Sequence, residues 1–211
     1  MKNRFITFEG VDGSGKSTQM EFLNKKLLKL NIPFISLRDP GSNKLSESIR
    51  EILLDKNNIE LSNISESFLF LAARAQLVEK EILPALAMKK FVLCDRFTDS
   101  TLAYQGYGRG LSINLLKILN NFATQDIKPS LTFIIDIDEE TIFERLNDHS
   151  HDRMESTGIE FYKKIREGYY QLSKENKKRY FIIDGNRSKI EIFDDIWKIV
   201  IDRYRIMENN E

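Results

Sequence analysis

A glycine-rich segment near the N-terminus constrains this chain more than any other stretch. From residue 10 to residue 17 it follows the pattern G-x-x-x-x-G-K-S. A short apolar run precedes the pattern, and apolar residues at helical spacing follow it, so it predicts a phosphate-binding loop between a strand and a helix. Backbone N–H groups of such a loop point at an anion, aided by the positive end of the helix dipole. The residues expected to hold the phosphate tail of a nucleotide are Gly10, Val11, Asp12, Gly13, Ser14, Gly15, Lys16, Ser17 and Thr18.

Two side chains of this loop, together with one distant acid, suggest phosphate and metal chemistry. Lys16 is expected to reach the β- and γ-phosphates, and the Ser17 hydroxyl is expected to reach Mg²⁺. Asp95 ends an apolar run about eighty residues beyond the lysine, where a carboxylate can hold Mg²⁺ directly or through water. Read alone, Asp95 is also compatible with an ordinary turn residue at the end of a strand.

Length and composition exclude several classes of protein. The 211 residues fit a single domain, and 32 basic residues balance 32 acidic ones, which is unlike a nucleic-acid-binding or anionic-membrane-binding chain. No apolar run is long enough to span a membrane. Cys94 is the only cysteine, so an intrachain disulfide is impossible, and we expect a cytoplasmic protein without nucleic-acid or membrane partners.

Five apolar stretches alternate with segments of helical periodicity. The predicted strands cover residues 4–8, 33–37, 91–94, 131–135 and 180–183, and the longest predicted helix runs from about residue 66 to residue 86. Since these strands do not alternate polar and apolar residues, we predict an α/β fold: a P-loop NTPase-type three-layer sandwich, with a five-stranded parallel sheet covered by helices on both faces. The polar stretch 147–158 is expected to be an exposed, mobile lid.

Three arginines are candidates for clamping either an acceptor or the group that is transferred to it. Arg38 and Arg96 follow predicted strands, and Arg74 lies on the long predicted helix. The carboxyl ends of parallel strands share one rim, and arginine offers two donors to one phosphate. A single arginine is more often a solvated surface residue, so each candidate depends on the others. If the acceptor is itself a phosphate, it is an anion at neutral pH and needs no general base.

Four motifs in this order make the chain resemble the thymidylate kinase family. They are FEGVDGSGKSTQ at 8–19, RDPG at 38–41, FLAARAQ at 70–76 and DRFTDSTLAYQGYGRG at 95–110, of which the last is the most specific. The resemblance covers most of the chain. It implies transfer of the γ-phosphate of ATP to dTMP with Mg²⁺, in a protein that forms a homodimer.

The resemblance also implies roles for single residues. Phe70 would stack on thymine, and Arg74 would donate to a thymine carbonyl. Asp12 would accept from the 3′-hydroxyl, and Tyr104 would crowd the 2′ position. The base edge would be completed by Ser100, Thr101 or Gln105. Arg38 and Arg96 would hold the dTMP phosphate. Glu9 would help to arrange metal or water near the acceptor, and Arg145 would lie against adenine.

The chain departs from the family pattern at two places. Residues 38–43 read RDPGSN where the family usually has Arg-Glu-Pro-Gly-Gly-Thr, which shortens the acid and removes a glycine. The phosphate-binding loop also lacks the arginine of some members, and members without it usually carry basic residues in the lid. In this chain the lid holds Arg153 and two histidines, so Arg153 is predicted to supply the catalytic charge, with help from a protonated His149.

Two alternative functions stay open at this stage. A kinase of the same class could act on another nucleoside monophosphate or on a deoxynucleoside, although the motifs at 70–76 and 95–110 favour a thymine deoxynucleotide. A non-catalytic nucleotide switch that reads guanine would need an Asn-Lys-x-Asp motif. The pairs Asn24-Lys25 and Asn43-Lys44 lack that aspartate, which disfavours such a switch.

Overall fold

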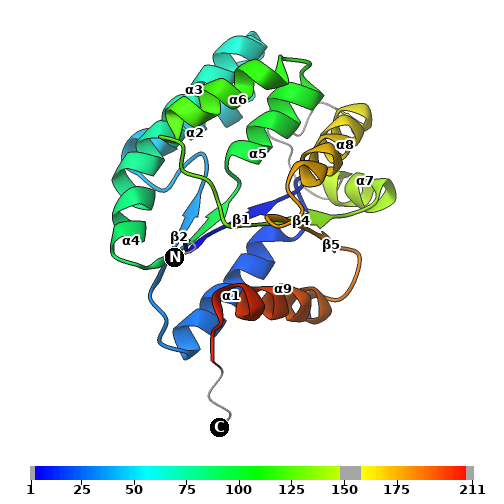
Figure 1. The fold of residues 1–211 in the computed structure, drawn as a ribbon. Helices are drawn as coiled ribbons and strands as arrows, with labels where there is room; N and C mark the ends of the chain where they lie inside the picture. Colours follow the sequence, from blue (N-terminus) through cyan, green and yellow to red (C-terminus); the bar gives the residue numbers. More distant parts are fainter. Residues whose placement is uncertain (1–2, 148–157, 208–211) are drawn as a thin grey trace.

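A computed structural model describes residues 3–147 and 158–207 of the chain (Figure 1). Five parallel strands form one sheet in the order β2-β3-β1-β4-β5. The strands are β1 (Phe5–Glu9), β2 (Phe34–Arg38), β3 (Phe91–Asp95), β4 (Leu131–Asp136) and β5 (Tyr180–Asp184). The predicted α/β architecture and all five predicted strands are therefore confirmed. Most strand ends lie one residue beyond the predicted position.

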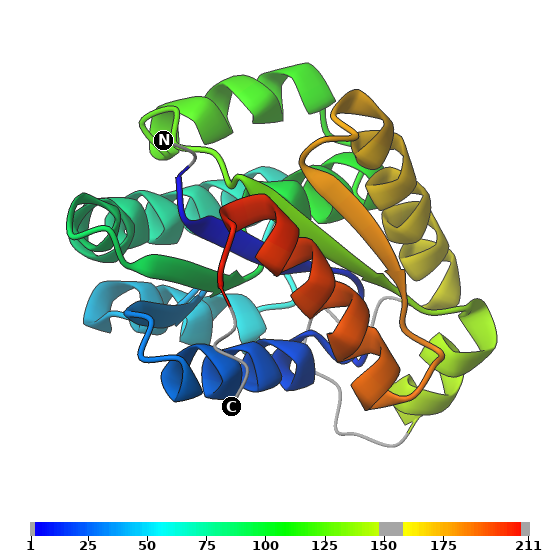
Figure 2. The ribbon, with the colours of Figure 1, turned by 60° about the horizontal axis from the view of Figure 1, so that its bottom comes forward.

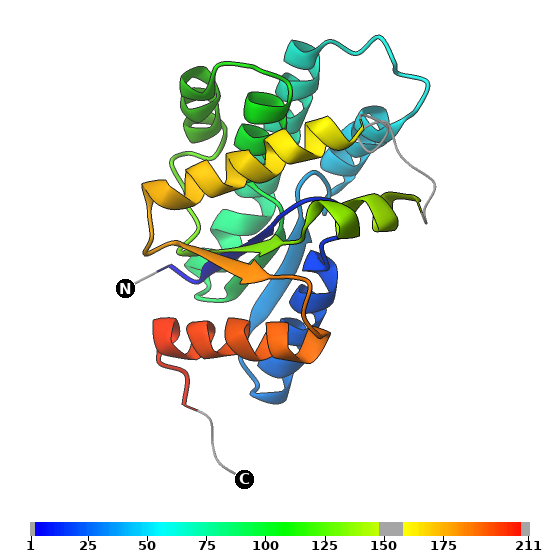
Figure 3. The ribbon, with the colours of Figure 1, turned by 90° about the vertical axis from the view of Figure 1, so that its right-hand side faces the viewer.

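Helices cover both faces of the sheet, as Figures 2 and 3 show. On one face lie α1 (Lys16–Lys29) and α9 (Lys189–Tyr204). The other face and the rim above it carry α2 (Lys44–Leu54), α3 (Asn63–Leu77), α4 (Leu83–Ala87), α5 (Thr98–Thr101), α6 (Ile113–Ala123), α7 (Glu139–Asn147) and α8 (Ile159–Glu175).

Neighbouring residues on a strand pack into different cores because strand side chains alternate between the two faces. On β1, Ile6 and Phe8 join the core beneath α1 and α9, whereas Phe5 packs into the core on the opposite face. Val92 and Cys94 of β3 also point into that second core, and all of these side chains are buried. A strand buried on both sides has no polar face, which explains its continuous apolar sequence.

The long helix predicted over residues 66–86 differs from the structure in two ways. It begins earlier, at Asn63, because the Ser62 side chain accepts a hydrogen bond from the Ser65 backbone N–H and caps the first turn. A π-helical turn, η1 (Val78–Ile82), then separates α3 from α4. A second π-helical turn, η2 (Leu102–Gly108), carries Tyr104 and Gln105, in the segment whose sequence is most specific. Such turns recur at functional sites.

Loops that leave the carboxyl ends of β1, β2 and β3 meet above one rim of the sheet, and the three strands are adjacent there. Within the described ranges, we find no helix with the length and apolar character needed to span a bilayer.

Candidate active site

The loop after β1 forms the phosphate-binding turn that its sequence predicts. Gly10, Gly13 and Gly15 have positive φ angles of 135°, 72° and 94°. At Gly10 a Cβ atom would lie 2.4 Å from the Ile135 carbonyl oxygen, so β4 leaves no space for a side chain there. Lys16 begins α1, and its ammonium donates to the carbonyl oxygens of Gly10 (3.2 Å) and Val11 (2.8 Å).

A wide cavity of about 710 Å³ opens beside this loop. It is lined by Lys16, which is buried, and by the neighbouring polar residues of the turn. Burial and the nearby Arg96 guanidinium lower the pKa of Lys16 to about 8, because both disfavour a second positive charge. A negative phosphate tail would favour the charged lysine. The loop residues lining the cavity are Asp12, Gly13, Gly15, Lys16, Ser17 and Thr18, while Gly10, Val11 and Ser14 lie behind it.

Ser17 and Asp95 come together at the floor of the same cavity. The Ser17 hydroxyl donates to Asp95 Oδ2 at 3.0 Å, and Asp95 Oδ1 is buried without a hydrogen-bond partner among the described residues. An orphaned carboxylate oxygen beside a hydroxyl fits Mg²⁺, which usually takes one or two protein oxygens, substrate phosphates and water. The described ranges contain no group of three or more His, Cys, Asp or Glu residues that could hold a metal alone.

Arg96 connects the phosphate-binding loop to the segment that follows β3. Its guanidinium donates to the Gly10 carbonyl at 2.9 Å, to Asp12 Oδ1 at 2.5 Å and to the Tyr104 hydroxyl at 3.0 Å. Burial alone would raise the pKa of Asp12, but Arg96 and Lys16 outweigh it and lower that pKa to about 2. The same Asp12 charge holds the pKa of Arg96 above its usual range despite burial. Both groups are therefore charged at neutral pH.

A second and smaller cavity, of about 70 Å³, lies next to the first. Its floor includes Arg74, whose side chain is 1% exposed. Eight residues proposed from sequence for the acceptor nucleotide line it together: Asp12, Phe70, Arg74, Arg96, Ser100, Thr101, Tyr104 and Gln105. Residues from three segments that are distant in the sequence therefore line one cavity.

The Arg74 guanidinium is held by groups of the protein itself. Nε donates to Asp39 at 2.5 Å, and Nη1 donates to Thr101 (2.7 Å) and to Asn120 (2.6 Å). Nη2 donates to the Phe97 carbonyl at 3.1 Å. Since a guanidinium has five N–H groups, these contacts leave one on Nη2 for a ligand.

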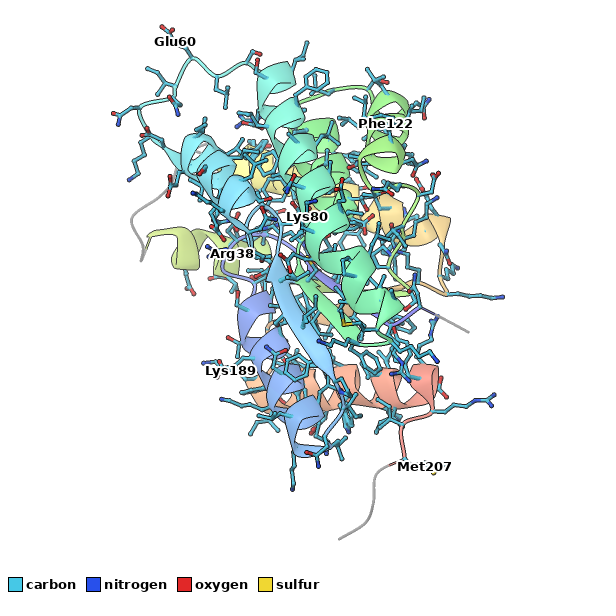
Figure 4. The ribbon with its side chains drawn as sticks, turned by 90° about the vertical axis from the view of Figure 1, so that its left-hand side faces the viewer. Arg38, Glu60, Lys80, Phe122, Lys189 and Met207 are labelled. Atoms are coloured by element: carbon cyan, nitrogen blue, oxygen red, sulfur yellow. The ribbon has the colours of Figure 1, made fainter. Side chains whose placement is uncertain are left out.

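Four other residues singled out from sequence are not among the described residues that line this second cavity. Arg38 lines the wide cavity but not the second one, and its exposed side chain pairs with Glu47 at 2.7 Å where β2 ends (Figure 4). The side chain of Arg145, on α7, and the whole of Arg153 lie outside the described part of the chain. Glu9 lines neither cavity. Its roles toward metal or water therefore stay predictions, as do those of Arg145 and Arg153.

Glu9 is fully buried behind the Arg96 segment. Its carboxyl group accepts from the Phe97 backbone N–H (2.8 Å), the Ser100 hydroxyl (2.5 Å) and the Tyr169 hydroxyl (2.9 Å). Burial is the main reason that its pKa rises to about 7, and the charge of Asp99 adds to the effect. Glu9 thus positions the segment that carries Arg96 through its hydrogen bonds to Phe97 and Ser100.

Sequence reasoning missed several residues that build the site. Asp39 was noted only as a shortened acid, yet it holds Arg74, and Arg50 of α2 lines both cavities. Asn120 and Tyr169 come from α6 and α8, far along the chain. A helical position facing the core can be read from periodicity, but its polar partner on another element cannot.

The departure at residues 38–43 keeps the geometry that a glycine would adopt. Ser42 stands where the family usually has glycine and has a φ of 68°, in the left-handed region. Its backbone N–H donates to Glu47 at 2.7 Å, and its hydroxyl accepts from the Arg38 N–H at 2.7 Å. Asn43 replaces the usual threonine and caps α2 by accepting from the Ser46 N–H. Local hydrogen bonds therefore offset a strain of about 1 kcal/mol at Ser42.

The parallel sheet, the phosphate-binding loop with its serine–aspartate pair and the adjoining arginine-lined cavity define a P-loop NTPase-type phosphotransferase. A family model described as thymidylate kinase matches residues 8–196. Thymidylate kinase of Thermoanaerobacter sp. (strain X514) is 47% identical over 200 residues, covering 95% of this chain and 98% of that protein. Thymidylate kinase of Kosmotoga olearia is 44% identical over 195 residues, covering 92% of this chain and 93% of that protein.

A crystal structure of thymidylate kinase from Ehrlichia chaffeensis superimposes with a TM-score of 0.77 at 36% identity, covering 95% of this chain and 99% of that one. The chain belongs to the thymidylate kinase family, whose members are ATP-dependent phosphotransferases.

Replacing Glu9 by Gln should flatten the dependence of stability on pH. A carboxyl group whose pKa is raised on folding binds its proton more tightly in the folded state, so stability falls as pH rises from about 4.5 to about 7. For this shift the loss is up to about 3 kcal/mol, and Gln imitates the protonated form. Urea unfolding of the ligand-free protein at pH 5 to 8 measures the effect.

Glu47→Gln is the matched control, because hydrogen bonding from Arg38 lowers the pKa of Glu47 and places its titration below this pH range. Parallel pH profiles for the wild-type protein and Glu9→Gln would contradict the assignment of a raised pKa to Glu9.

Proposed function

We propose that this chain transfers the γ-phosphate of ATP to dTMP, giving dTDP and ADP. The observation that carries the proposal is the junction of two cavities. The wide cavity beside the phosphate-binding loop and the narrower one beside Phe70 share Asp12, Asp39, Arg50 and Arg96 in their linings. A triphosphate in the first and a monophosphate in the second would place the reacting groups side by side, and such placement supplies much of the catalysis of phosphoryl transfer.

On the donor side, we propose that backbone N–H groups of residues 13–18 and the Lys16 ammonium hold the phosphate tail of ATP. Ser17 and the unpaired oxygen of Asp95 would hold Mg²⁺, directly or through water. When bound, the metal would supply positive charge that offsets the negative charge of the phosphate groups. Arg145 would lie against adenine, since guanidinium planes stack on π faces.

On the acceptor side, Phe70 offers an aromatic face for thymine, and Arg74 offers its remaining Nη2 N–H to a thymine carbonyl. Tyr104 packs against Arg96 and donates to Asp12 at 3.0 Å. We propose that Tyr104 fills the space that a ribose 2′-hydroxyl would need and that Asp12 accepts from the 3′-hydroxyl. Ser100, Thr101 and Gln105 would face the rest of the base edge.

The chemistry requires no general base from the protein. A phosphate monoester has a second pKa of about 6, so the acceptor is already an anion at neutral pH. Lys16 and Arg96 would absorb the charge that develops on the transferring group, and Arg38 would help to hold the acceptor phosphate. We further propose that Arg153 adds lid charge and that the protein acts in the cytoplasm.

A panel of acceptors tests this function against the alternative of another P-loop kinase. With ATP and Mg²⁺ present, we expect ADP release to be fastest with dTMP, because the second cavity combines an aromatic face with donors and acceptors for a pyrimidine edge. Coupled assays with dTMP, dUMP, dCMP, dGMP and thymidine measure the order. Faster turnover of dGMP or of thymidine than of dTMP would assign the chain to a different acceptor.

We also propose that two copies of the chain associate through α3 and α6, which pack side by side. Exposed apolar side chains gather on these helices: Phe122 is 86% exposed, and the others are Ile64, Phe68, Leu115 and Ile118. Figure 4 shows Phe122 at the outer surface of α6. Apolar surface of this kind on neighbouring helices favours an interface between protein chains.

Phe122→Asp should convert a dimer into a monomer, because the interface would have to bury a carboxylate. Sedimentation velocity at micromolar concentration measures the mass. Leu28→Asp is the control, since Leu28 is an exposed apolar residue of α1, on the opposite face of the sheet. A monomeric wild-type protein, or a dimeric Phe122→Asp variant, would contradict this assembly.

A further inference from the structure

The buried acid Glu66 lies on α3, one helical turn before Phe70 and two turns before Arg74. Its side chain is 0% exposed, and none of the roles described above uses it. One of its oxygens accepts from Gln105 Nε2 at 2.9 Å, and the other lies 3.5 Å from Arg109 Nη2. A carboxylate is costly to bury, and here two donors from the segment after β3 compensate it.

This contact determines which end of the Gln105 amide faces the carboxylate. Gln105 Nε2 donates to a Glu66 oxygen, so the amide turns its NH₂ group toward Glu66. The amide oxygen, Oε1, then lies on the other branch of the side chain. Gln105 lines the acceptor cavity, and it is otherwise 1% exposed. One hydrogen of the NH₂ group is engaged by Glu66, and Oε1 is the acceptor that Gln105 can offer to a base in the cavity.

We infer that Glu66 is a positioning residue that sets the choice of pyrimidine by fixing the Gln105 amide. This inference rests on the proposed function. Thymine and uracil carry a hydrogen on N3, which Oε1 can accept, whereas N3 of cytosine is itself an acceptor and would face another lone pair. A site built to receive one hydrogen bond rejects an analogue that lacks it, because a buried polar group is then left unpaired.

Glu66→Gln tests the inference, because Arg109 should determine which way the introduced amide turns and therefore which group it presents to Gln105. Arg109 has only donors, so it should hold the oxygen of the introduced amide and turn the NH₂ group of that amide toward Gln105. The Gln105 amide should then flip and present its own NH₂ group to the cavity. We expect kcat/KM for dTMP to fall by about 10- to 100-fold, mainly through KM, and the ratio of kcat/KM for dUMP over dCMP to fall by about 10-fold.

The pair dUMP and dCMP isolates the effect, because the two differ only in the base edge at positions 3 and 4. A dTMP analogue methylated at N3 gives a second readout: the wild-type protein should discriminate against it, and Glu66→Gln should discriminate less. General damage to the fold would lower turnover of every acceptor without changing these ratios. Ser67→Ala is the control, since it removes a neighbouring buried hydroxyl on α3 that donates to the Asn63 carbonyl.

Glu66→Asp covers the case in which Glu66→Gln does not fold. It keeps the negative charge but shortens the side chain by one methylene, which weakens its hold on the Gln105 amide, so the dUMP over dCMP ratio should again fall. An unchanged ratio in whichever variant folds, with dTMP turnover intact in the wild-type protein, would overturn the inference alone. A wild-type protein that does not phosphorylate dTMP would overturn the proposed function and this inference with it.

Discussion

The contact of the Arg96 guanidinium with the phosphate-binding loop is the interaction on which the site depends. Through Gly10 and Asp12 it ties the turn after β1 to the segment after β3, more than eighty residues away. Arg96 itself has a φ of 66°, a left-handed conformation that a long side chain rarely adopts. Its backbone N–H donates to the Phe8 carbonyl, and Glu9 accepts from the next N–H, at Phe97. The end of β1 thus holds the backbone in the conformation that aims the guanidinium.

A set of buried charges extends this arrangement around the second cavity. Arg74 is held by Asp39, Thr101 and Asn120, and Glu66 is held by Gln105 and Arg109. Buried ion pairs contribute little net stability, because desolvation offsets most of their attraction. Their effect here is geometric, because these contacts hold Arg74 and Gln105, two residues that line the cavity, in fixed orientations. A rigid set of donors and acceptors can distinguish between bases that have nearly the same size.

Much of the fold follows from local patterns in the sequence. The glycine spacing predicted the turn that begins α1, and unbroken apolar runs predicted five strands buried on both faces. The strand ends then located Asp95 and Arg96 on one rim. What sequence did not predict are partners joined by tertiary packing. Asp39 and Arg74 are 35 residues apart, and Glu66 and Gln105 are 39 apart. Neither pair follows from periodicity, which reports the face of an element but not what lies opposite.

The kinetics of Arg96→Lys with ATP and dTMP show whether the Arg96 guanidinium acts on the transferring phosphate group. Lysine keeps the positive charge but lacks the planar guanidinium that contacts Gly10, Asp12 and Tyr104 from two nitrogens. Because the account assigns this fork to the charge that develops during transfer, it predicts a fall in kcat of about 100-fold or more, with a much smaller change in KM for dTMP. Arg4→Lys, at the opposite end of β1, should leave both constants unchanged. A change confined to KM in Arg96→Lys would contradict the account, because Arg96 would then serve binding alone.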